Sequence, residues 1–188
     1  MTGNESTPGA KIPPWKYEEI ERRVVKLYEE QHINKFPIDP FEIVKKRGYM
    51  LIPFSKFGKG TRPECADENN DAFSFYHPDL KTNVIVYNDD KPLRRIRFTL
   101  MHEVGHIDLG HKCESDLARK MADYYAGYAL APSPLIGKFA SEESADIAAT
   151  FGVSYDCAEI CGCRYQNWQQ YGGRYLKDYE IKMISLFN

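Results

Sequence analysis

The pentapeptide "HEVGH", which spans residues 102–106, contains two histidines and one glutamate. If the segment is helical, His102 and His106 lie on one face, because residues four apart on a helix are neighbours. Two imidazole nitrogens on one face can bind a divalent cation, and zinc suits such ligands. Glu103 would lie beside them and accept a proton from an activated water molecule. The pattern therefore predicts a zinc site with Glu103 as general base, as in metal-dependent peptidases.

The motif is short, and five-residue matches also arise by chance in helices whose histidines bind nothing. His111 is a further histidine nearby. The peptidase pattern with a third histidine ligand requires that histidine ten residues after the first and a glycine three residues before it. Lys112 and Leu109 occupy those positions. We therefore expect His111 to lie at the helix end or beside the site, and not to be a ligand.

The helices that must position the motif follow from apolar periodicity. Residues 88–111 have helical spacing and begin with Asp and Pro residues, which favour a helix start. Residues 115–132 predict a second long helix that ends at Pro132. Further helices are predicted at 134–140, at 179–187 and on both sides of the "FGVS" turn at 151–154.

The chain before the motif predicts two helices and three strands. The helices span 15–33 and 37–48, and in the second Asp39 can cap, Pro40 lies in the first turn and Gly48 ends the helix. The strands span 49–54, 73–78 and 82–88, with a polar loop at 55–72. We predict an α+β fold, a small antiparallel or mixed sheet with a mainly helical body. Residues 1–14 are expected to be flexible, and 15–188 to form one domain.

Composition narrows the possible partners. The net charge of −2 and the pI near 6.2 argue against direct binding to nucleic acid or membrane surfaces. No apolar run approaches the ~20 residues that span a bilayer, and the N-terminus lacks a secretion-signal pattern. With no such signal, the five cysteines predict reduced thiols in a cytoplasmic protein. Residues 144–164 have the outline of a helix-turn-helix, but the second helix is acidic and apolar, so a DNA-binding role is the weakest alternative.

Three blocks of the sequence resemble the ImmA/IrrE metallo-endopeptidases of bacteria and their mobile genetic elements: "RFTLMHEVGHIDLGH", "ADYYAGYALAPSPLI" and "FGVSYDCAEICGCRYQNW". The resemblance runs from about residue 20 to the C-terminus. It implies a zincin-like domain of mixed α/β structure. It also implies zinc-dependent cleavage of a helix-turn-helix repressor, which makes the protein an anti-repressor.

The resemblance also implies a third zinc ligand, a glutamate, at the position that Arg119 occupies here. An arginine cannot bind zinc, because its guanidinium stays protonated. The resemblance gives the residue four positions further on, Asp123 here, a supporting role as a hydrogen-bond acceptor. Three alternatives for the ligand remain open: Asp123 replaces the missing ligand, Asp116 does, or only water completes the site. We place Asp123 first, so the expected metal ligands are His102, His106 and Asp123. The alternative function is a peptidase-fold binding module that captures a regulator without cutting it.

Overall fold

The computed structural model describes residues 11–57, 71–113 and 115–188. Helices α1 (Pro14–Glu30) and α2 (Pro40–Lys46) come first, followed by strand β1 (Met50–Pro53) and the 3-10 turn η1 (Phe54–Phe57). Strands β2 (Ala72–His77) and β3 (Thr82–Tyr87) form a hairpin. The rest of the chain is helical: α3 (Leu93–Asp108), α4 (Asp116–Leu130), α5 (Ser133–Phe139), α6 (Ser144–Phe151), α7 (Tyr155–Tyr171) and α8 (Asp178–Ser185). The predicted α+β class, a small sheet with a mainly helical body, is confirmed.

The sheet is mixed, with strand order β1-β3-β2. The central strand β3 runs parallel to β1 and antiparallel to β2. Its side chains alternate between two apolar clusters, as a strand buried on both faces requires. Ile85 joins the main core with the helices, whereas Val84 and Val86 pack with Phe54 on the opposite face. Strand β2 is therefore an edge strand, and one face of the sheet lies against the helical body.

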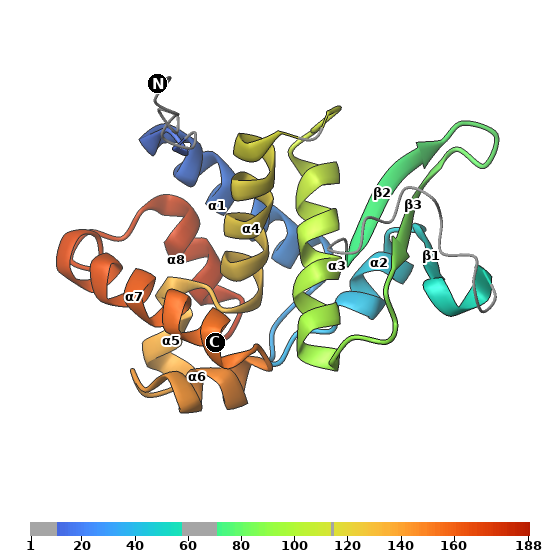
Figure 1. Ribbon diagram of the computed structural model, residues 1–188. Helices are drawn as coiled ribbons and strands as arrows, with labels where there is room; N and C mark the ends of the chain where they lie inside the picture. The colour runs from blue at the N-terminus through green and yellow to red at the C-terminus, as the bar shows by residue number, and fades with distance from the viewer. Residues whose placement is uncertain (1–10, 58–70, 114) are drawn as a thin grey trace, which may run out of the picture.

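Helix α3 lies between the β2-β3 hairpin and helix α4 (Figure 1). It is shorter than the predicted 88–111, because Pro92 holds an extended conformation just before its first turn. The expected cap at the start of α2 is confirmed: the Asp39 carboxylate accepts from the backbone N–H of Phe41 at 2.9 Å. Gly48, with φ of 70°, follows the end of that helix as expected.

Helices α3 and α4 approach closely at Gly105. A Cβ atom at this position would lie 3.0 Å from the ring of Tyr125, which is fully buried. The Tyr125 hydroxyl donates to the Asp108 carboxylate at 2.5 Å, and the other oxygen of that carboxylate pairs with Arg47. These contacts fasten the C-terminal end of α3 to α4 and to the residue that follows α2.

Two of the predicted segments lie mostly outside the described residues. They are the flexible segment 1–14 and the polar loop 55–72. Within the described ranges, Pro14 already begins α1, and residues 15–57, 71–113 and 115–188 share one large apolar core. No helix in these ranges has the length and apolarity needed to cross a membrane.

The close approach at Gly105 predicts different effects for two Gly→Ala variants in helices. Gly105→Ala should lower the free energy of unfolding by about 1–2 kcal/mol, because the added methyl group overpacks against Tyr125. Gly162→Ala is the matched control: its Cβ would meet Ile147 at an ordinary 3.4 Å, so better helix propensity should stabilise it by about 0.5–1 kcal/mol. Urea unfolding of both variants measures the difference, and equal effects would contradict the packing argument.

Candidate metal centre

The structure brings His102 and His106 together on α3. Their Nε2 atoms lie 3.0 Å apart. Two nitrogens bound to one tetrahedral zinc at ~2.0–2.1 Å would lie ~3.3 Å apart, so the spacing requires little adjustment. Both rings are partly buried, and they converge from successive turns of one helix. The helical geometry predicted from the spacing is confirmed, and the role of the two histidines as ligands stays a prediction.

Asp123 contacts His102 from the neighbouring helix α4. Its Oδ1 atom lies 2.8 Å from Nδ1 of His102, on the side of the ring away from His106. A carboxylate only accepts hydrogen bonds, so Nδ1 carries the proton and Nε2 presents a lone pair. Histidine ligands in metal sites commonly donate their second N–H to such a partner. This placement favours orientation of His102 by Asp123. Direct ligation by Asp123 stays a prediction.

His111 contacts His106 in the way that Asp123 contacts His102, through the ring nitrogen Nδ1. Gly110, with φ of 67°, turns the chain after α3, and the Nδ1 atom of His111 comes to lie 3.0 Å from Nδ1 of His106. When Nε2 of His106 offers a lone pair to a cation, its Nδ1 donates to His111. Burial lowers the pKa of His111 below its usual value, and the charges of Lys16 and His102 add in the same direction. The lowered pKa favours the neutral ring, whose unprotonated nitrogen can accept a hydrogen bond.

Two convergent lone pairs, each fixed by a partner at the other ring nitrogen, fit a divalent cation held by two protein nitrogens. A third protein ligand does not join them within the described ranges, where no group of three His, Cys, Asp or Glu side chains can hold a metal ion. Arg119 is exposed on α4. Asp116 lies one turn before Lys120 and pairs with it at 2.9 Å. Which of the three alternatives completes the site stays a prediction.

Glu103 lies next to the histidine pair and is buried, with 6% of its surface exposed. Its Oε2 atom accepts a hydrogen bond of 2.6 Å from the hydroxyl of Ser74, which lies on β2. The sequence did not predict this contact, because it joins two elements 29 residues apart in the chain. Strand alternation predicts only that Ala72 and Ser74 share one face of β2.

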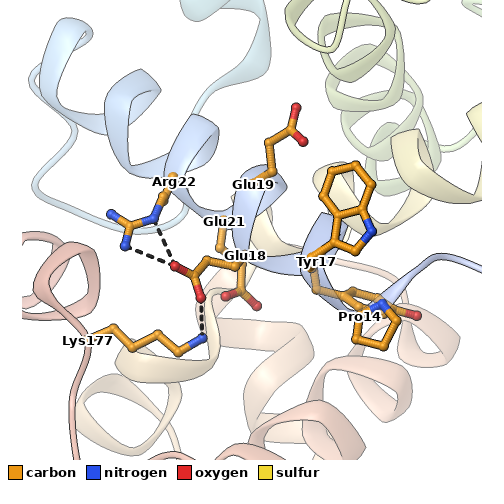
Figure 2. Close-up of a pocket in the computed structure, with 8 residues that line it drawn as sticks. Pro14, Tyr17, Glu18, Glu19, Glu21, Arg22 and Lys177 are labelled. Carbon is orange, nitrogen blue, oxygen red and sulfur yellow. Dashed lines mark hydrogen bonds and ion pairs between the residues drawn. The ribbon is translucent and has the colours of Figure 1, made fainter.

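A separate pocket lies at the start of α1, where Lys177 faces the helix (Figure 2). Glu18 lines it and bonds Arg22 at 2.9 Å and Lys177 at 2.8 Å. Glu21, also in the lining, accepts from two tyrosine hydroxyls. Burial raises the pKa of Glu21, and the two tyrosine hydrogen bonds partly offset that rise. Because these carboxylates are matched by partners of the protein itself, we assign no ligand to the pocket.

Cys157, Cys161 and Cys163 of α7 belong to no group of three side chains that could hold a metal ion in the described residues. Cys161 is buried and its thiol donates to the Gly127 carbonyl oxygen at 3.7 Å, so α7 packs on α4. Cys163 is exposed. Gly152 and Ser154 form the expected turn and cap between α6 and α7.

Comparisons with known proteins agree with the motif. The sequence model of the peptidase M78 family, described as the IrrE N-terminal-like domain, matches residues 61–160, more than half of the chain. No curated protein matches the sequence. A solved structure described as a Mycobacterium tuberculosis transcriptional regulator is similar, with a TM-score of 0.50 and 15% identity over 75% of this chain. That match covers 45% of the other chain, and at such identity it shows similarity of fold alone.

The partners of the two histidines predict the effect of their removal. Asp123→Ala and His111→Phe should each weaken zinc binding by about 10–100-fold, because the rings lose the groups that orient them. Competition with a chromophoric chelator measures the affinity. His77→Phe, which removes a histidine from β2, is the control and should bind as the unaltered protein does. Unchanged affinity in both site variants would show that neither group holds its ring.

Proposed function

Because the chain belongs to the peptidase M78 family, we propose that it is a zinc-dependent endopeptidase that cleaves a regulatory protein. One observation carries the proposal: the Nε2 atoms of His102 and His106 lie 3.0 Å apart on α3, and Glu103, the residue after His102 on the same helix, is buried. A zinc ion there would polarise a peptide carbonyl and lower the pKa of the attacking water. His102 and His106 would hold the ion through Nε2.

The remaining residues orient groups and move a proton. Glu103 accepts the proton of the attacking water at its carboxylate and passes it to the departing amine, the usual work of a general base that later acts as an acid. Asp123 and His111 keep the two imidazoles in the tautomer that presents Nε2.

The edge strand β2 supports a protein substrate. Among the described residues it pairs with β3 on one side only, and it carries Ser74, which touches Glu103. An extended segment of a protein can add to such an edge through backbone hydrogen bonds, and it would then run beside the proposed base. The resemblance of the sequence to the ImmA/IrrE enzymes favours a helix-turn-helix repressor as that protein. The free thiols of the described cysteines are consistent with action in the cytoplasm.

Glu103→Gln tests the chemistry directly. With a repressor encoded beside this gene as substrate, the variant should cleave at least about 100-fold more slowly, since the amide cannot take up a proton. It should retain its zinc, because Glu103 is not a ligand. Glu159→Gln, an exposed change on α7, is the control and should cleave at the unaltered rate. Equal cleavage by the Glu103→Gln variant would rule out the proposed mechanism.

Arg119 gives a reason to weigh a second function. With arginine at the position where the resemblance implies a ligand, the site binds zinc through fewer protein groups. A chain of this kind can capture a repressor without cutting it. Zinc well below one ion per chain, together with intact repressor binding, would favour this binding module over the enzyme.

Restoring a carboxylate at position 119 should separate the two functions. Arg119→Glu is expected to tighten zinc binding about tenfold or more, which corresponds to about 1.4 kcal/mol. Lys120→Glu makes the same charge reversal one residue further along α4 and controls for the general effect of charge. If the two variants bind zinc equally, position 119 does not face the cation.

A further inference from the structure

We propose that Ser74 is a positioning residue that fixes the Glu103 carboxylate for proton transfer. The inference rests on the proposed function of Glu103 and extends it to a residue that neither the motif nor the family match identifies. The contact itself is direct: the Ser74 hydroxyl donates to Oε2 of Glu103 at 2.6 Å.

The sheet holds Ser74 in place. Its backbone pairs with Ile85 of the central strand β3, and Ile85 is fully buried in the main core beside the helices. Phe73 and Phe75, the neighbours of Ser74 along β2, stack on each other with ring centroids 6.2 Å apart. Alternation along the strand therefore turns the Ser74 side chain to the opposite face, the one towards α3.

The hydrogen bond from Ser74 restrains the terminal side-chain torsion of Glu103, which burial alone does not fix. The terminal torsion of a glutamate side chain is broad and roughly two-fold, so burial alone does not select one carboxylate plane. A hydroxyl that donates to an anionic oxygen makes a short, strong bond and selects one plane. With Oε2 bound to Ser74, the plane of the Glu103 carboxylate is fixed relative to strand β2.

Ser74 lies on strand β2, the strand to which we propose that the substrate peptide binds. The residue that positions the base belongs to the same edge strand along which an extended peptide would add. A peptide seated on β2 is therefore held in register with the Glu103 carboxylate by one rigid element. Misplacement of the base should lower kcat and leave KM almost unchanged, because the peptide itself loses no contact.

Three serine variants test the role in repressor cleavage. Ser74→Ala should lower kcat by about 10–100-fold, the range for a lost hydrogen bond to a charged group, with KM and zinc content unchanged. Ser74→Thr keeps the hydroxyl and should restore most of kcat. Ser185→Ala removes a hydroxyl that donates to a backbone oxygen on α8 at 2.7 Å, and should have no effect. An unchanged kcat in Ser74→Ala overturns the inference.

Crystal structures of the three Ser74 forms give a readout that does not depend on cleavage. The Glu103 carboxylate should turn or shift in Ser74→Ala and keep its place in Ser74→Thr. If it stays in place in Ser74→Ala, the positioning role is wrong even where cleavage is observed. If it moves as expected while the unaltered protein cleaves no repressor, the positioning role holds and the proposed peptidase function fails.

Discussion

The site depends on how closely α3 and α4 approach each other. Gly105 lies against the ring of Tyr125, with no room for a side chain between the two helices. This approach brings Asp123 within hydrogen-bonding distance of His102, and the Tyr125 hydroxyl binds Asp108 on the same helix as the histidines. A larger residue at position 105 would separate the helix that carries the motif from the helix that orients it.

The chemically important groups of the site have supporting contacts from three parts of the chain. Strand β2 supplies the hydroxyl that binds Glu103, α4 supplies the carboxylate that binds His102, and the turn after α3 supplies the imidazole that binds His106. The fold therefore does more than present a helix with two histidines. It determines the ring tautomers and the carboxylate orientation, the features on which general base chemistry at a metal depends.

Much of this arrangement followed from local patterns in the sequence. The four-residue spacing of His102 and His106 predicted their shared face, and the Asp39 cap and the turn at Gly152 were read from single residues. The mixed sheet was harder, since a parallel pairing between β1 and β3 joins segments that are distant in the chain. The contacts of Ser74 and Asp123 were beyond local patterns for the same reason: each depends on how separate elements pack. The resemblance implied a ligand at the position of Arg119 and a supporting acceptor at Asp123, and the structure shows which ring nitrogen of His102 the Asp123 carboxylate contacts.

The contacts of Asp108 with Arg47 and Tyr125 bear on whether folding of the protein depends on the proposed ion. These three side chains are not proposed ligands, and their contacts anchor the end of α3. The ring of Tyr125 is itself part of the apolar core. Small zinc domains are unfolded without their metal, because ligation supplies their folding energy. Here an apolar core and contacts between non-ligand side chains hold the helix that carries the two histidines. Removal of the proposed ion would therefore leave the main source of folding free energy in place.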